Sequence, residues 1–264
     1  MYYLGIDIGS LSCDAVVIDE SEKVLASSVI PTGARNREAI VRASDEVLRS
    51  AGILDKEVKA IVSTGYGRKR VEGRLTAVTE ISCHARGIKK LLPGIRLLVD
   101  IGGQDSKAIE LDEKGQVVDF AMNDKCAAGT GRFLEAMARA LEVDIEVMSG
   151  LDNGALGDTT ISSMCTVFAE SEVVSLIAEG VKVNEIVHGL NRAIASRTHS
   201  LIKRITPDYN GFPVAMSGGV ARNSGVVRAI SAALDKEVAI PHLPDTVGAL
   251  GAALIARERA LKNQ

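Results

Sequence analysis

The sequence predicts an α/β protein made of two related halves. In the first half, an apolar strand pattern runs into Asp7-Ile8-Gly9-Ser10, and a second strand pattern follows the glycine turn. The second half repeats this arrangement at Asp100-Ile101-Gly102-Gly103. A third glycine motif, Gly218-Gly219, joins an apolar strand pattern to a helical one. Each hairpin turn is expected to expose backbone N–H groups, and such a turn can hold phosphate.

The elements of the first half follow from its periodicity. The opening hairpin covers residues 2–19, and a third strand is predicted from Lys23 to Val29. Apolar residues at helical spacing predict a helix over 36–51, and Val58 to Ser63 is a further strand. Asp7 lies inside an apolar strand, where a lone carboxylate is costly to bury, so it could hold a magnesium ion bridged to phosphate. The alternative is an ordinary hairpin.

The second half begins with its hairpin over residues 97–111. The elements predicted after it are a strand over 116–120, helices after Cys126 and Cys165, a long helical region over 183–205, a strand over 213–217, a short strand over 237–240 and a small-residue helix from Gly248. The small residues of the last helix would let it pack very closely on a neighbour.

Two cysteines stand just ahead of predicted helices. Cys126 precedes a turn rich in glycine and threonine. Cys165 leads into the apolar residues Val167, Val174 and Leu176, with Glu170 and Glu172 among them. A helix N-terminus favours a thiolate and any anion placed beside it, including an anionic metal cluster. The alternative is that each cysteine is a small buried hydrophobe. The charged and small neighbours of Cys126 favour a site over a core position.

Other motifs and the composition limit the possible functions. Of 264 residues, 46% are hydrophobic and 25% charged, the net charge is −3, and aromatic residues make up 3%, which disfavours nucleic-acid binding. We expect a cytoplasmic protein without a membrane segment, with four cysteines that are reduced thiols, ligands or core residues rather than disulfides. The basic run Arg68 to Arg70 is interpreted as a solvated face or as a contact for a partner or an anionic substrate. The neighbouring pair Cys83 and His84 lacks the rest of a metal-ligand set.

The three glycine motifs, in this order, resemble the superfamily of acetate kinase, sugar kinases, heat-shock 70 proteins and actin. The resemblance implies a two-lobed actin-like ATPase with duplicated ribonuclease-H-like domains and a nucleotide cleft between the lobes. The N-terminal lobe would be residues 1–95, with the C-terminal helix 248–264 as a possible addition, and the C-terminal lobe would be residues 96–247. By resemblance, Asp7, Asp100 and Gln104 would be catalytic, and Asp7 and Asp100 would bind magnesium directly or through water. The implied ATP/ADP-binding residues are Gly9, Ser10, Leu11, Ser12, Cys13, Gly102, Gly103, Gln104, Asp105, Gly129, Gly218, Gly219 and Asn223.

Within that superfamily the chain resembles the activators, or component A, of 2-hydroxyacyl-CoA dehydratases and the ATPase subunits of benzoyl-CoA reductase. The residues that carry this narrower resemblance are Asn123-Asp-Lys-Cys-Ala-Ala-Gly-Thr-Gly-Arg-Phe133, Ser163-Met-Cys-Thr-Val-Phe-Ala-Glu-Ser-Glu172, Thr64-Gly-Tyr-Gly-Arg68 and Glu80-Ile-Ser-Cys-His84. It implies a homodimer that shares one [4Fe–4S] cluster, with Cys126 and Cys165 of each subunit as ligands. Members of that family usually carry a lysine soon after the first glycine turn, whereas this chain has Ser12-Cys13-Asp14.

The resemblance further implies a function and its partners. The protein would take one electron from ferredoxin or flavodoxin, hydrolyse ATP, and pass the electron at low potential to a component D-like iron–sulfur dehydratase. Three alternatives stay open. The acceptor could be a double-cubane-cluster protein that reduces small molecules. The chain could instead be a small-molecule kinase of the same superfamily, or a nucleotide sensor or scaffold without iron.

Overall fold

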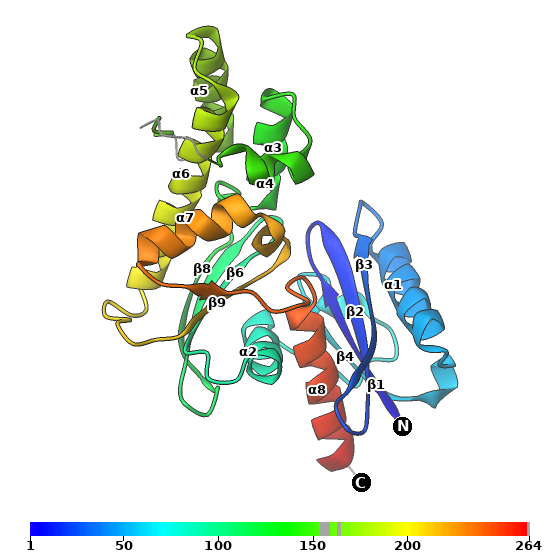
Figure 1. The fold of residues 1–264 in the computed structure, drawn as a ribbon. Helices are drawn as coiled ribbons and strands as arrows, with labels where there is room; N and C mark the ends of the chain where they lie inside the picture. The colour runs from blue at the N-terminus through cyan, green and yellow to red at the C-terminus, as the bar shows by residue number, and fades with distance from the viewer. Residues whose placement is uncertain (154–158, 163–164, 263–264) are drawn as a thin grey trace. The chain divides into compact units, whose positions relative to one another are not determined.

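The computed structural model describes residues 1–153, 159–162 and 165–262. The chain, coloured by residue number in Figure 1, divides into two compact units. Unit 1 comprises residues 1–96, 111–118 and 241–264, and unit 2 comprises residues 97–110 and 119–240. Among the described helices, none is both long and apolar enough to cross a lipid bilayer.

Unit 1 is a five-stranded mixed sheet with helices on both faces. Its strands are β1 (Tyr2–Ile8), β2 (Ser12–Asp19), β3 (Val24–Pro31), β4 (Val58–Gly65) and β5 (Thr76–Ala77), in the order β3-β2-β1-β4-β5. Its helices are α1 (Asn36–Ala51), α2 (Glu80–Leu91) and α8 (Val247–Lys262), with the short 3-10 turns η1 (Asp55–Glu57) and η2 (Arg68–Arg70). One hydrophobic cluster lies between the sheet and α1, and another lies between the sheet and the helices α2 and α8.

Helix α8 lies very close to strand β1 and to helix α2. A Cβ atom added to Gly5 would overlap the Ala249 carbonyl oxygen, and one added to Gly251 would overlap the Cys83 carbonyl oxygen. Glycine is therefore required at both positions for these backbones to approach. This arrangement confirms that the small residues of the last helix serve close packing.

Segment 111–118 belongs to unit 1, although the sequence analysis places it in the C-terminal lobe. Leu111 and Arg96 join here: the Leu111 N–H donates to the Arg96 carbonyl at 2.8 Å, and Arg96 Nε donates to the Leu111 carbonyl at 2.6 Å. These two hydrogen bonds extend, by one residue pair, the antiparallel pairing of strands β6 (Leu97–Ile101) and β7 (Ser106–Leu111).

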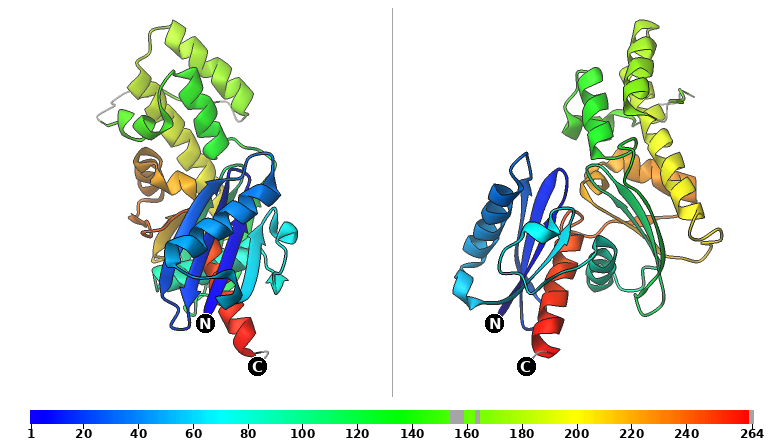
Figure 2. Two further views of the ribbon diagram at one scale, coloured as in Figure 1. Left: turned by 90° about the vertical axis from the view of Figure 1, so that its right-hand side faces the viewer. Right: turned by 180° about the vertical axis from the view of Figure 1, so that it is seen from behind.

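Unit 2 repeats the sheet of unit 1 and adds a helical layer. Its strands are β6 (Leu97–Ile101), β7 (Ser106–Leu111), β8 (Val117–Asn123), β9 (Val214–Ser217) and β10 (Val238–Ala239), in the order β10-β9-β6-β7-β8. Its helices are α3 (Gly131–Ala140), α4 (Ile145–Leu151), α5 (Thr166–Ala178), α6 (Val183–Lys203) and α7 (Ser224–Leu234), with the 3-10 turn η3 (Gly219–Arg222) before α7. The views in Figures 1 and 2 show α3, α4 and α5 gathered around the first part of α6.

The two sheets have the same topology. In each, a central strand pairs antiparallel with the strand that follows the glycine turn, and parallel with a later strand on its other side. The duplication that the sequence predicts is therefore present in both units.

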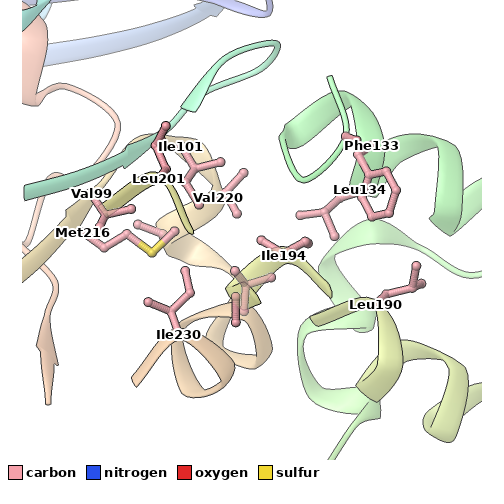
Figure 3. Packing of buried hydrophobic residues seen from close by; sticks show 14 of the residues in the cluster. Val99, Ile101, Phe133, Leu134, Leu190, Ile194, Leu201, Met216, Val220 and Ile230 are labelled. Carbon is pink, nitrogen blue, oxygen red and sulfur yellow. The ribbon is translucent and has the colours of Figure 1, made fainter. Parts of the chain in front are cut away.

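The core of unit 2 joins its sheet to its helical layer through α6. Figure 3 shows Ile194 of α6 between two groups of side chains, with Val99 and Met216 of the sheet on one side and Phe133 and Leu134 of α3 on the other. All of these side chains are buried. Helix α6 thus carries a continuous hydrophobic core from the sheet to the helix that follows Cys126.

Candidate functional site

The two glycine turns have the same hydrogen-bond geometry. In unit 1 the Gly9 N–H donates to the Ser12 carbonyl at 2.9 Å, and in unit 2 the Gly102 N–H donates to the Asp105 carbonyl at 3.0 Å. Each turn is thus held by a hydrogen bond between its first and last residues, and it follows an aspartate near the end of a central strand. Gln104 is exposed at the second turn, where a ligand could reach it.

Asp100 is held by a buried polar network in unit 2. Its Oδ1 accepts a hydrogen bond from Ser217 Oγ at 2.7 Å, and its Oδ2 lies 3.1 Å from Lys107 Nζ. Lys107 Nζ also lies 2.7 Å from Asp105 Oδ2, so one ammonium serves two carboxylates. A carboxylate with these partners is stabilised in its charged form, which is the form that binds magnesium. Neither Lys107 nor Ser217 was predicted as a site residue, although Lys107 lies in the predicted strand directly after the second glycine turn.

The second glycine turn is bonded directly to the turn that follows Cys126. The N–H groups of Gly131 and Arg132, at the start of α3, donate to the carbonyls of Gly102 and Gly103, both at 2.9 Å. Thr130 Oγ1 is within hydrogen-bond distance of the Gly103 carbonyl at 2.9 Å and of the Ala127 carbonyl at 2.6 Å. A displacement of the glycine turn would therefore be passed to the segment that carries Cys126.

Asp7, at the equivalent position in unit 1, lies between two glycines. A Cβ atom at Gly65 would overlap Asp7 Oδ1, and one at Gly248 would overlap Asp7 Oδ2, so the absence of side chains makes room for this carboxylate. Asp14 lies directly opposite on β2 and is also buried. Burial, followed by the charge of Asp7, raises the pKa of the Asp14 carboxyl well above its ordinary value.

The remaining nucleotide-binding candidates lie at turns of unit 2. Gly218 has a positive φ of 85°, and a Cβ there would overlap the Ile101 carbonyl oxygen, so glycine is required. Gly219 begins η3, and Asn223 caps α7 through a hydrogen bond from the Val226 N–H to its Oδ1 at 3.1 Å. Gly129 also has a positive φ, of 89°. Their contacts with a nucleotide stay predictions.

The four cysteines fall into two pairs of different accessibility. Cys165 is exposed at the N-cap of α5, and Cys126 is half-buried in the turn before α3. Cys165 thus directly precedes its helix, and the predicted turn, residues 127–130, lies between Cys126 and α3. Cys13 and Cys83 are buried, and burial raises the pKa of each thiol to about 12. Among the described residues, no three His, Cys, Asp or Glu side chains converge as a metal site.

The remaining sequence motifs are the residues beside Cys165 and the Cys83–His84 pair. Ser163 and Met164, which belong to the motif around Cys165, lie outside the described residues. His84 is buried, and its Nδ1 lies 3.0 Å from the Glu80 carbonyl oxygen. Together with the burial of Cys83, this arrangement makes the Cys83–His84 pair part of the α2 packing.

Cys126 also lines a basic groove in unit 2 of about 740 Å³. Helix α6 and its C-cap contribute Arg192, Arg197 and Arg204 to the wall, and no Asp or Glu is among the described residues that line it. The Arg197 guanidinium carbon lies 5.5 Å from the centre of the Phe133 ring. Burial lowers the pKa of Arg197, and the charge of Cys126 opposes that shift. The three arginines thus give the groove wall beside Cys126 a positive charge, and sequence reasoning did not identify them.

Comparison with known proteins assigns this chain to a family. The family model of the BadF/BadG/BcrA/BcrD ATPases matches residues 4–256. The activator of lactoyl-CoA dehydratase from Anaerotignum propionicum is 47% identical over 262 residues, which cover 99% of this chain and 100% of that protein. This chain is a member of the BadF/BadG/BcrA/BcrD ATPase family.

Solved structures agree with this assignment. The activator of the 2-hydroxyisocaproyl-CoA dehydratase from Clostridium difficile, with bound ADPNP, matches with a TM-score of 0.92 at 42% identity, covering 100% of this chain and 97% of that one. Component A of the Acidaminococcus fermentans (R)-2-hydroxyglutaryl-CoA dehydratase matches with a TM-score of 0.93 at 39% identity, covering 99% of each chain. More distant sugar kinases, 14% to 18% identical, share the fold alone. The two-lobed α/β ATPase fold class is confirmed.

Proposed function

We propose that this protein is an ATP-dependent activator that donates one electron at low potential to an iron–sulfur enzyme of the 2-hydroxyacyl-CoA dehydratase type. The observation that carries this proposal is the pair of accessible thiols, Cys126 and Cys165, in the unit that holds the second glycine turn. The relatives named as dehydratase activators, and the ADPNP bound to one of them, support the same reading.

Two thiols of this chain fit an iron–sulfur cluster, and two do not. Cluster ligands are thiolates that a metal can reach. The side chains of Cys126 and Cys165 are accessible, whereas Cys13 and Cys83 are buried with raised pKa values. A [4Fe–4S] cluster takes four cysteine ligands and, when bound, supplies one-electron transfer. We propose that a two-fold symmetric homodimer provides Cys126 and Cys165 twice.

Helix α5 offers a surface for such a dimer. Directly after Cys165, its apolar side chains Val167, Phe168, Val174 and Ile177 are exposed. Exposed apolar patches of this kind are typical of protein interfaces. A dimer that covered this face would bury these side chains close to the proposed ligand.

We propose that residues of the two hairpins bind the nucleotide. Asp7 with residues 9–13 in unit 1, and Asp100 with residues 102–105 in unit 2, would contact the phosphates and magnesium, while Gly218, Gly219 and Asn223 would contact adenosine. Loss of the terminal phosphate would release contacts at the second turn. Because Thr130 bonds to both Gly103 and Ala127, that change would reach Cys126 within unit 2. Ferredoxin or flavodoxin would be the electron source.

Metal analysis of anaerobically purified protein tests this proposal. Iron, acid-labile sulfide and molecular mass are measured on one size-exclusion peak. We expect about four iron and four sulfide per dimer. A monomer that hydrolyses ATP and contains no iron would contradict the electron-donor function and favour a kinase or a nucleotide sensor.

A further inference from the structure

The two hairpins differ at one buried position that their shared register makes directly comparable. On the strand that follows each glycine turn, the residue opposite the aspartate is Lys107 in unit 2 and Asp14 in unit 1. Lys107 brings a positive charge to Asp100 and Asp105. The matching place in unit 1 holds a second carboxylate. The charge balance of the first hairpin is therefore the opposite of that in the second.

Asp14 has a buried oxygen that its surroundings leave without a partner. Its side chain is 6% exposed, and Ser12 Oγ donates to Oδ2 at 3.1 Å, whereas Oδ1 has no hydrogen-bond partner among the residues that the structure describes. Directly opposite residues of an antiparallel pair project to the same face of the sheet, so Asp14 and Asp7 share one face. A buried carboxylate oxygen without a donor carries a large desolvation cost unless a cation or proton reaches it.

No lysine stands opposite Asp7 in the first hairpin, because that position is Asp14. Asp245 and His84 act on Asp14 with opposite signs, and both act less strongly than Asp7. Gly65 and Gly248 leave space for Asp7 but contribute no side chain. The arrangement is thus a pair of hard oxygen donors next to a glycine turn.

We propose that Asp7 and Asp14 together bind a divalent cation, Mg²⁺ in the cell, in place of the ammonium that Lys107 provides in the second hairpin. Mg²⁺ commonly binds one or two carboxylates, keeps several waters and completes its shell with phosphate oxygens. The resemblance to known activators implies a magnesium role for Asp7 and Asp100, and Asp14 is the new ligand. The phosphate contact rests on the proposed function, whereas the cation site itself does not.

Direct cation binding tests this site without a nucleotide. Mn²⁺, a paramagnetic substitute for Mg²⁺, is titrated into nucleotide-free protein, and the free ion is counted by electron paramagnetic resonance. Asp14→Asn should weaken binding at this site by about tenfold or more, since it removes one of two protein ligands, and Asp14→Lys should abolish it. Asp19→Asn, the same change at the other end of β2, is the control and should leave binding unchanged. Equal Mn²⁺ binding by the wild type and Asp14→Asn would overturn the site.

Thermal unfolding gives a second readout that does not depend on the spectroscopic probe. Without divalent ions, Asp14→Asn should melt at a higher temperature than the wild type, because it removes repulsion between two buried carboxylates. Mg²⁺ should raise the melting temperature of the wild type and leave that of Asp14→Asn nearly unchanged. The proposal would be overturned if the wild type melted at a higher temperature than Asp14→Asn without Mg²⁺ and Mg²⁺ did not change its melting temperature.

ADP binding separates this inference from the proposed function. Calorimetry with ADP in EDTA and in Mg²⁺ should show a strong Mg²⁺ requirement in the wild type and a weaker one in Asp14→Lys, whose ammonium replaces the cation. If Asp14→Asn lost Mn²⁺ binding and no variant bound ADP, the cation site would be supported and the nucleotide-dependent function would be rejected. If ADP binding by the wild type and by Asp14→Lys required Mg²⁺ equally, the proposal that Mg²⁺ takes the place of a lysine ammonium in the first hairpin would be wrong.

Discussion

Lys107 lies across the strand pair from Asp100, and its ammonium forms ion pairs with both Asp100 and Asp105, at 3.1 Å and 2.7 Å. All three side chains are almost completely buried. The ammonium is thus shared between the aspartate at the end of β6 and the aspartate of the glycine turn. We expect the geometry of this turn to depend on that charge.

Replacing Lys107 tests this dependence. Lys107→Met keeps most of the side-chain volume but leaves two buried carboxylates without their cation. Breaking a buried ion pair in this way should lower the free energy of unfolding by about 3–5 kcal/mol. Urea unfolding followed by circular dichroism measures the change. Lys69→Met, at an exposed position of η2, is the control, and an equal effect of both substitutions would contradict the structural role of Lys107.

The proposed cluster ligands make a prediction about iron. Cys126→Ser and Cys165→Ser should each abolish iron and sulfide while ADP still binds, because the ligands lie outside the glycine turns. Cys13→Ala and Cys83→Ala should retain the metal content of the wild type. Iron and sulfide assays with ADP calorimetry distinguish the cases. Loss of ADP binding together with iron would show that these cysteines maintain the fold instead.

The raised pKa values of Cys13 and Cys83 predict a selective reaction in iron-free protein. With pKa values of about 12, only about one in ten thousand of these thiols is ionised at pH 8, so iodoacetamide should label Cys126 and Cys165 and spare the buried pair. Mass spectrometry of peptides measures the labelling. Cys13 that reacts as fast as Cys165 would show that the buried thiol is accessible.

The same shifts predict how stability changes with pH. The folded state holds the thiol protons more tightly than the unfolded chain, whose thiols have an ordinary pKa of 9.0. The stability from both groups is therefore complete below pH 9 and decreases as the pH rises from 9 towards 12. Urea unfolding at pH 8 and pH 10 measures this loss. The Cys13→Ala and Cys83→Ala variants should lose less stability over the same interval than the wild type.

The exposed face of α5 predicts the oligomeric state of its variants. Replacing Phe168 and Val174 by serine should weaken a dimer by more than about 100-fold in dissociation constant, since each buried apolar side chain contributes about 1.5–3 kcal/mol. Light scattering across a dilution series measures the change. Val41→Ser, on the exposed face of α1, is the control. An unchanged dimer would place the interface elsewhere.

Local pattern was enough to predict most elements. The helix over 36–51 matches α1 (Asn36–Ala51), because its apolar spacing is regular and Gly52 adopts the left-handed conformation that ends a helix. The third strand, predicted from Lys23 to Val29, is observed over Val24–Pro31. Strand ends are harder to predict, since pairing with β2 sets them.

The burial of α5 could not be predicted from its pattern. Val167 and Val174 belong to the apolar residues that indicated this helix, yet both are exposed, and Ala169 and Val173 are buried instead. An apolar stripe has the same appearance whether it faces a core or a partner. Only the packing of the surrounding helices distinguishes the two.

The sequence by itself determined the duplicated hairpins, the glycine motifs and the two cysteines before helices, because each is a local pattern of residue types. The tertiary structure decided which groups surround them. Ser217 reaches Asp100 from a position 117 residues away, and Arg197 reaches the Cys126 turn from helix α6. The partners of a buried charge come from distant strands and helices, and their identity depends on register and packing that no local pattern contains.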